Sequence, residues 1–234
     1  MTGSIGCRSH GLSILKTKGR YGMNFTDHSD LAGTHAFLSP SQNAWTNYSD
    51  EKLVQRYLSA QAVERGTRLH EFAAEAIRLN RRLSGRDTLS MYVNDAIGYK
   101  MTPEQTLFYS YNCYGTTDAI AYKRNALRIH DLKTGEVEAH IKQLDIYAAL
   151  FCLEYGLKAN ELRKKGYGDN DIARYLGVKA NEIHFEPEKM DDIILRIYQF
   201  NEVKEEHPDP QEIRGFMNII INHDRVLSNL KAEE

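Results

Sequence analysis

The chain has 234 residues and a formal charge of −2, from 30 Lys and Arg residues against 32 Asp and Glu residues. This length fits one sizeable domain, or one domain with an insertion. The near-neutral charge excludes a globally basic nucleic-acid-binding protein, so any site for a polyanion has to be a local patch.

The three cysteines, Cys7, Cys113 and Cys152, lie far apart and form no C-x-x-C pair. This usage argues against a zinc ribbon or a disulfide framework and fits a reducing cytosol. The chain lacks four cysteine ligands for an iron–sulfur cluster, so we expect no such cluster. No apolar run approaches ~18 residues and no signal-peptide core begins the chain, so we expect a soluble protein that is not exported.

The first predicted helices follow a stretch without clear periodicity. The first ~35 residues are rich in Gly, Ser, Thr and His, which indicates loop or short strand. Ser39-Pro40-Ser41-Gln42 has the form of a capping box with proline at the first helical position, and it predicts a short helix through Trp45. Helical spacing of apolar residues over 50–83 predicts one long helix, or two helices broken near Gly66.

A β section follows a weakly helical stretch from Met91 to Ala96. Three β-prone runs are separated by turn residues, and they cover Gln105–Tyr111, Asp118–Tyr122 and Leu127–Leu132. Such spacing predicts an antiparallel meander.

The last predicted elements are a helix over Ile141–Tyr155, a final strand over Ile193–Tyr198 and a closing helix over Gln211–Leu230. Helices, a meander, a helix, a strand and a helix in this order predict an α/β fold with a mixed central sheet. We expect one domain over 1–234, with a helical insert at about 159–182.

The meander carries two aspartates and a lysine in a pattern that suits metal-assisted hydrolysis. Asp118 begins one predicted strand and Asp131 lies near the end of the next, so a hairpin brings their carboxylates together. Two close carboxylates repel each other, and a hard divalent cation such as Mg²⁺ or Mn²⁺ relieves the repulsion. Lys133 points to the same strand face as Asp131 and could hold a phosphate oxygen or orient the attacking water. The alternative is a surface salt-bridge ladder.

Three flanking residues are candidates for the same site. His70 shares a helix face with Ala73 and Ile77, where a lone histidine is more often a core residue than a ligand. Gln143 and Tyr147 stand at i and i+4 on the helix that follows, so their side chains project together.

In chain order this set resembles the RecB-like branch of the PD-(D/E)XK nucleases, whose pattern is G-x-x-x-H, G-x-x-D, (D/E)-x-K and Q-x-x-x-Y. The sequence has Gly66-x-x-x-His70, Gly115-Thr-Thr-Asp118, Asp131-Leu132-Lys133 and Gln143-x-x-x-Tyr147. Leu38-Ser39-Pro40-Ser41 looks like the serine-capped helix that begins many such domains, particularly phage stand-alone exonucleases. The resemblance covers 38–155 and the strand at 193–199.

The resemblance implies a restriction-endonuclease-like core and a role for each matching residue. His70, Asp118, Asp131 and the backbone carbonyl of Leu132 would bind Mg²⁺ or Mn²⁺. Lys133 would be the catalytic lysine, and Gln143 and Tyr147 would support the site or contact the DNA backbone. The sequence departs from the family pattern in having aspartate, at Asp131, where glutamate is commoner.

The insert contains a stretch, Glu161–Val178, that is similar to a helix–turn–helix. Arg163, Lys164 and Lys165 make its first helix basic, and Asp169 or Asn170 would cap the second. We favour a plain helical hairpin whose three basic residues contact phosphates without reading bases. Basic clusters at 16–20 and 78–86 are further candidate phosphate contacts, or solvated faces.

The sequence therefore predicts a Mg²⁺- or Mn²⁺-dependent deoxyribonuclease, most simply an exonuclease acting on DNA ends or single strands in recombination, repair or processing. The alternative is a non-catalytic DNA-binding or interaction protein on the same fold that uses the helix–turn–helix-like insert. Expected partners are DNA and a recombination or annealing protein, without a membrane, in the cytoplasm of a bacterial host or phage-infected cell. The pattern leaves exonuclease or endonuclease action, strand preference, DNA or RNA, and oligomeric state open.

Overall fold

The computed structural model describes residues 16–17, 25–26 and 36–232, in two compact units, Met1–Ser59 and Ala60–Glu234. The first unit contains strands β1 (Lys16–Thr17) and β2 (Phe25–Thr26), which pair antiparallel, and a 3₁₀ helix η2 (Pro40–Asn47). Most of the first 35 residues, with most of the basic cluster at 16–20, lies outside the described residues.

The predicted capping box is wrong, although a helix does begin at Pro40. The backbone of Ser39 is extended and its side chain makes no capping hydrogen bond. Its hydroxyl instead lies 2.9 Å from the Ser41 hydroxyl, and its carbonyl accepts a hydrogen bond from Trp45 Nε1 at 3.0 Å. The serine is therefore satisfied by two other partners, and the short element forms as a 3₁₀ helix.

Helix α1 (Asp50–Arg78) begins in the first unit, enters the second at Ala60 and continues without a break past Gly66. Of the two predicted forms, one long helix is confirmed. Helix α2 (Thr88–Tyr99) is longer than the predicted segment, because Asp87 caps it by accepting a hydrogen bond from Ser90 N at 3.0 Å.

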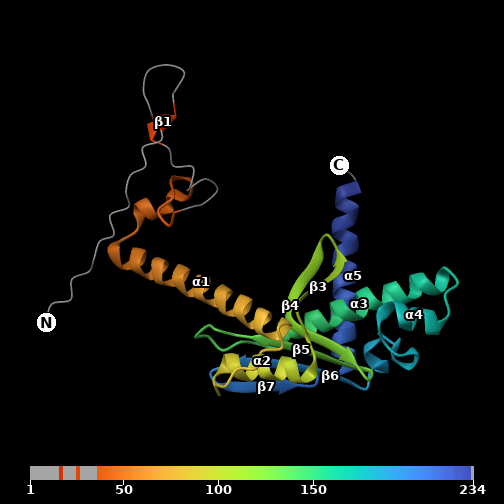
Figure 1. Ribbon diagram of the computed structural model, residues 1–234. Coiled ribbons are helices and arrows are strands. Elements are labelled where there is room, and N and C mark those ends of the chain that lie inside the picture. Colours follow the sequence, from red (N-terminus) through yellow and green to blue (C-terminus); the bar gives the residue numbers. More distant parts are fainter. Residues whose placement is uncertain (1–15, 18–24, 27–35, 233–234) are drawn as a thin grey trace. The chain divides into compact units, whose positions relative to one another are not determined.

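A five-stranded mixed sheet is the centre of the second unit (Figure 1). Its strands are β3 (Thr102–Ser110), β4 (Cys113–Lys123), β5 (Ala126–Leu132), β6 (Asp192–Gln199) and β7 (Glu202–Glu206), in this spatial order. Among the described strands only β5 and β6 pair in parallel, and the predicted antiparallel meander is confirmed. The chain is thus α/β with a mixed sheet flanked by helices.

Two strand predictions are wrong. Asp118 does not begin its strand, because β4 starts at Cys113 and pairs with β3 through Gly115 and its neighbours. The strand at 193–198 is not the last, since β7 follows it at the edge of the sheet. The sequence of β7, EVKEE, has no apolar alternation because nearly all of its side chains are exposed.

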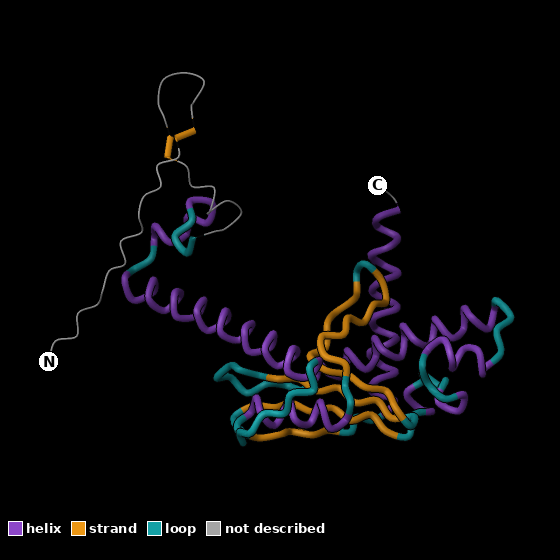
Figure 2. Tube along the Cα trace, in the orientation of Figure 1, coloured by secondary structure: helices purple, strands orange, loops and turns teal. Residues whose placement is uncertain are grey.

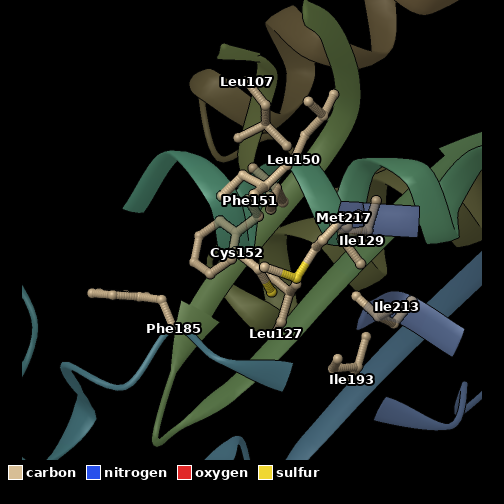
Figure 3. Packing of buried hydrophobic residues seen from close by; sticks show 14 of the residues in the cluster. Leu107, Leu127, Ile129, Leu150, Phe151, Cys152, Phe185, Ile193, Ile213 and Met217 are labelled. Atoms are coloured by element: carbon tan, nitrogen blue, oxygen red, sulfur yellow. The ribbon is translucent and has the colours of Figure 1, made fainter. Parts of the chain in front are cut away.

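Helices cover both faces of the sheet (Figure 2). Ala73 and Ile77 of α1 pack with Val93 of α2 against one face in a smaller core. The larger core lies on the other face, where α3 (Lys142–Lys164) and α5 (Pro210–Ala232) pack over β4, β5 and β6. Figure 3 shows part of this core, with Leu127 and Ile129 of β5 near Leu150 and Phe151 of α3, and Ile193 of β6 beside Ile213 of α5.

The predicted insert is a helical hairpin that belongs to the larger core. Its first arm is the end of α3, and its second is α4 (Asp169–Leu176), whose Ile172 and Ala173 are buried in that core. Gly168 is the N-cap residue, so the predicted cap at Asp169 or Asn170 is displaced. Short 3₁₀ helices η3 (Ala180–Glu182) and η4 (Pro187–Lys189) lead to β6. None of the helices in the described parts of the chain is long and apolar enough to cross a membrane.

Candidate metal-binding and catalytic site

The predicted site residues come from four elements of the second unit. Asp118 lies inside β4, and Asp131 and Leu132 end β5, with Lys133 directly after them. Lys133 N donates to Tyr198 O at 2.9 Å, so the backbone continues along β6 for one residue beyond the strand. His70 comes from α1, and Gln143 and Tyr147 come from the first turns of α3.

The pairing of β4 with β5 brings the two carboxylates together. Ala119 lies opposite His130 in the antiparallel register. One residue further toward the end of β5, Asp131 therefore comes beside Asp118. Asp118 Oδ2 accepts a hydrogen bond from the backbone N–H of Leu132 at 2.8 Å. This bond fixes the orientation of Asp118 and leaves its other oxygen, Oδ1, turned toward α1.

Asp131 is a buried acid with one oxygen that lacks a hydrogen bond. Its exposed fraction is 4%. Burial, and then the neighbouring charge of Asp118, raise the pKa of Asp131 to about 6, although Lys133 opposes the shift. Lys133 Nζ donates to Oδ1 at 3.2 Å. It also lies 3.0 Å from Oδ2, so the ammonium forms an ion pair with both oxygens, although the contact with Oδ2 lacks hydrogen-bond geometry and leaves that buried oxygen without a hydrogen bond.

Lys133 also contacts the first turns of α3. Its Nζ donates to Gln143 Oε1 at 3.1 Å, and Gln143 Nε2 donates to Tyr147 OH at 3.3 Å. Gln143 and Tyr147 are one turn apart on the helix, as the sequence predicted. The chain of bonds from Asp131 through Lys133 to these two side chains holds the ammonium group beside the carboxylates.

His70 is directed at the same carboxylate pair. Its Nδ1 lies 3.2 Å from Asp118 Oδ1, and its side chain is about one-third exposed. The hydrogen bond to Asp118 raises the pKa of His70, while partial burial opposes the increase. The histidine is therefore not the buried core residue that its apolar helix face first suggested.

Two motif glycines are explained by close approaches to the site. A Cβ atom on Gly66 would lie 2.9 Å from Thr134 Oγ1, and one on Gly115 would lie 2.9 Å from the ring of Tyr147. Any larger residue forces a neighbour to move. The glycines thus let α1 approach the end of β5, and let α3 approach β4, at the positions from which His70 and Tyr147 reach the site.

A polar chain that joins the buried His130 and Tyr198 to the partly exposed Asp95, on the opposite face of β5, was not predicted. Tyr198 OH donates to Asp95 Oδ2 at 2.7 Å and lies 3.1 Å from His130 Nδ1. Because the single hydroxyl hydrogen goes to Asp95, Nδ1 of His130 carries the proton and donates to Tyr198. Burial, with the charges of Arg196 and Arg128, lowers the pKa of His130 to about 3, so the ring is neutral. A histidine inside an apolar alternating strand was the only sequence signal.

The donors at the site suit a hard cation that keeps part of its water shell. In the described parts of the chain no three His, Cys, Asp or Glu side chains converge closely enough to bind a metal ion. Mg²⁺ seldom needs such a set, because one or two carboxylates with water and substrate phosphates are its usual ligands. Oδ2 of Asp131, which accepts no hydrogen bond and lies beside the like charge of Asp118, fits this requirement.

The basic residues of the insert are not part of the candidate metal site. Arg163, Lys164 and Lys165 lie at the far end of α3, about 30 Å along the helix from Gln143. Arg163 forms an ion pair with Asp169 at 3.3 Å, which occupies part of its guanidinium group.

Comparison of the chain with protein-family models, with curated proteins and with solved structures found no match.

Proposed function

We propose that the chain is a Mg²⁺- or Mn²⁺-dependent nuclease that hydrolyses phosphodiester bonds of DNA on a PD-(D/E)XK core. The observation that carries the proposal is the buried Asp131, whose Oδ2 has no hydrogen-bond partner although Asp118 and Lys133 lie beside it. A structural salt bridge alone does not account for the site, because a second carboxylate, that of Asp118, lies beside Asp131 and raises its pKa, so the one ammonium group of Lys133 faces two acids.

The two carboxylates are the anchor for the metal ion, and the Leu132 carbonyl and His70 complete the proposed ligand set. A bound divalent ion would lower the pKa of a water ligand and stabilise charge on the phosphate. Because Nδ1 of His70 is bonded to Asp118, His70 would bind the ion through Nε2, or through Nδ1 once this hydrogen bond opens. Because Asp118 Oδ2 is held by Leu132 N, its Oδ1 is the oxygen that can change partner.

Lys133 is the proposed catalytic lysine. Its ammonium is held between Asp131 and Gln143, with about one-third of the side chain exposed, so one face is open to a substrate. There it can hold a phosphate oxygen and neutralise negative charge that develops during hydrolysis. Gln143 and Tyr147 position the lysine and are candidate contacts to the DNA backbone.

The proposed biological role is that of an exonuclease that processes DNA ends or single strands in recombination or repair. It is carried by the resemblance of the four motifs to RecB-like and phage stand-alone enzymes. A non-catalytic DNA-binding protein is the weaker alternative, because α4 is only eight residues long and packs Ile172 and Ala173 into the core. This arrangement leaves little of the helix to read bases.

Incubation with end-labelled linear DNA and with circular DNA, in Mg²⁺, Mn²⁺ or EDTA, tests the proposal. We expect cleavage of linear DNA with either metal ion and none with EDTA. An exonuclease leaves covalently closed circles intact, whereas an endonuclease cuts both substrates. Asp118→Ala is the matched inactive variant. Binding without cleavage under every metal condition would contradict the proposal and favour the non-catalytic alternative.

A further inference from the structure

A pocket of about 310 Å³ lies at the end of the β4–β5 hairpin, between the hairpin and the last turn of α2. Its charged lining residues are Lys100, Lys123, Arg124 and Arg128, and no carboxylate of the described residues lines it. Arg82 extends toward the same place, since its Nη2 would lie 3.7 Å from a Cβ atom on Gly98 in the pocket wall. The pocket is thus a concentration of positive charge in a chain whose net charge is −2.

The pocket is distinct from the candidate metal site. Lys123 lies five residues beyond Asp118 on β4, or about 17 Å along the strand. Because side chains alternate along a strand, Lys123 and Asp118 also project from opposite faces of the sheet. Arg128 and Asp131 are related in the same way on β5. None of the pocket's residues belongs to the set that we assign to catalysis.

The cations of the pocket have not been neutralised by the protein. Elsewhere many arginines and lysines are paired, and Arg196, which borders this region, binds Asp95 and Glu205. In the described part of the chain, no carboxylate lies within ion-pair distance of the side chains of Lys100, Lys123, Arg124 or Arg128. Glu182 lies nearby, but it accepts from the backbone N–H of Arg124 at 3.1 Å.

The side chains are also positioned by the fold. The guanidinium of Arg128 lies 4.2 Å from the centre of the Tyr99 ring, and the guanidinium of Arg196 lies 5.3 Å from the same centre. Arg124 and Asn125 form the two-residue turn between β4 and β5. The side chain of Asn125 holds this turn by donating to Lys189 O at 2.7 Å.

Two of the cations occupy backbone positions that favour glycine. Arg124 has φ of 54° in a turn type that prefers Asn or Gly, and Lys100 has φ of 56° at the C-terminal cap of α2. A long charged side chain in the left-handed region carries a conformational cost. The turn and the cap would form at least as well with glycine, so the backbone does not explain these residues.

We propose that this pocket is a second binding site, for a ligand that carries two or more phosphate groups. Several unpaired cations around one concavity require a multiply charged anion, and guanidinium groups bind phosphate oxygens in pairs. Phosphates of a nucleic-acid strand and of a free nucleoside diphosphate share this chemistry. The assignment does not depend on the proposed nuclease function, because it uses no residue of the metal site.

Calorimetric titration of the full chain with pyrophosphate, in EDTA, tests the site without involving the metal. We expect saturable binding that is weakened about tenfold or more in Arg124→Gly and in Lys100→Gly, since each loses a charge-assisted hydrogen bond. Both variants should keep or raise the melting temperature, because glycine adopts a positive φ without the steric cost that a side chain carries. Loss of binding with retained stability separates a ligand role from a structural one.

Two control variants isolate the charge and the backbone. Asn80→Gly makes the same backbone change at another residue with positive φ, and Arg225→Gln removes an exposed arginine of α5. Both should bind pyrophosphate like the unmodified chain. Absence of pyrophosphate binding, or equal affinity in the pocket variants and the controls, would overturn the proposal.

Parallel titrations with a short single-stranded oligonucleotide and with a nucleoside diphosphate identify the source of the phosphates. If the same two substitutions weaken binding of the oligonucleotide, the pocket holds a nucleic-acid strand away from the cleavage site. If they weaken binding of the nucleoside diphosphate alone, the pocket binds a free phosphate ester. A failure of either arm leaves the nuclease proposal untouched, since cleavage is measured separately with Mg²⁺.

Discussion

Lys133 combines two features that a surface salt bridge does not need. It bonds a carboxylate that is 4% exposed, and it bonds the amide of Gln143, which belongs to a different element. The first contact reduces the cost of the buried charge on Asp131, and the second fixes the direction of the ammonium group. These contacts support a positioned catalytic cation.

We expect Lys133→Ala to reduce single-turnover cleavage by ~10²–10³-fold or more, while DNA affinity changes little. One phosphate contact among many contributes mainly to the salt dependence of binding. Lys133→Arg should restore binding but not rate, because arginine keeps its proton and has a wider planar group. Near-normal rates in both variants would remove Lys133 from the mechanism.

Asp145, in the first turn of α3, is predicted to be a source of pH-dependent stability. Burial, with the charges of Glu212 and Glu206, raises its pKa to about 6 from the ordinary value of 3.8 for an aspartate. A pKa that is raised in the folded state stabilises the protein below the unfolded value and loses that contribution as pH rises through the folded value. The contribution is therefore present below about pH 4 and lost above about pH 6.

Asp145→Asn should accordingly raise the melting temperature at about pH 8 and have little effect at about pH 4. Thermal unfolding at these two pH values is the measurement. A stabilisation of equal size at both would show that the carboxylate charge is not the cause.

At the scale of elements, a comparison of two helical glycines distinguishes the effect of close packing on stability from the effect of helix propensity. Gly66 of α1 approaches Thr134, whereas a Cβ atom on Gly156 of α3 would have no heavy atom within 4 Å. Gly156→Ala should therefore gain most of the helix propensity difference, about 1 kcal/mol in the free energy of unfolding.

Gly66→Ala should gain less than Gly156→Ala, or lose stability, because the new methyl group displaces Thr134 and with it the end of β5. It should also reduce cleavage, since Thr134 follows Lys133 directly. Denaturant unfolding of the two variants gives the comparison. Equal stabilisation of both would show that Gly66 is not needed for the close approach.

The elements that could be predicted from sequence are those with strong periodicity. Leu127–Leu132 alternates, and β5 extends only one residue further. The edge strand β7 was missed because it has no buried face, and the cap at Ser39 failed because the serine hydroxyl found Ser41 instead. The spacing of apolar residues predicts an element where the buried side chains follow that spacing. It fails where no face is buried, and where a polar side chain has several possible partners.

The candidate site could be predicted only in part for a related reason. Asp131 and Lys133 are two residues apart, so strand geometry alone places them together. The bond of His130 to Tyr198 joins residues 68 positions apart, and no local pattern indicates it. The pocket beside Tyr99 likewise depends on the arrangement of α2 over the β4–β5 hairpin, although the basic run around Arg82 had indicated a phosphate contact.

At the scale of the whole molecule, both hydrophobic cores found among the described residues are built from residues at position 73 and beyond. All of the candidate site and the phosphate pocket lie in the same unit, Ala60–Glu234. We therefore expect the residues of this unit to contain what folding and the proposed catalysis require.

A fragment of residues 60–234 should unfold cooperatively, with a melting temperature close to that of the full chain, and should keep its metal-dependent cleavage. A shorter fragment, 79–234, is the control. It lacks Ala73, Ala76 and Ile77 of the smaller core as well as His70, so it should be less stable and inactive. If the longer fragment fails to fold, residues before 60 are part of the cooperative unit.

Single-turnover cleavage of DNA by the full chain and by Asp131→Asn, at saturating protein with Mg²⁺, tests the central claim most directly. Asparagine keeps the size of the side chain and removes the buried charge, so the variant should be at least as stable above pH 6. The account predicts rapid cleavage by the unmodified chain, abolished by EDTA, and a loss of about 10³-fold or more in the stable variant. Cleavage by Asp131→Asn at the unmodified rate, or cleavage that persists in EDTA, would contradict it.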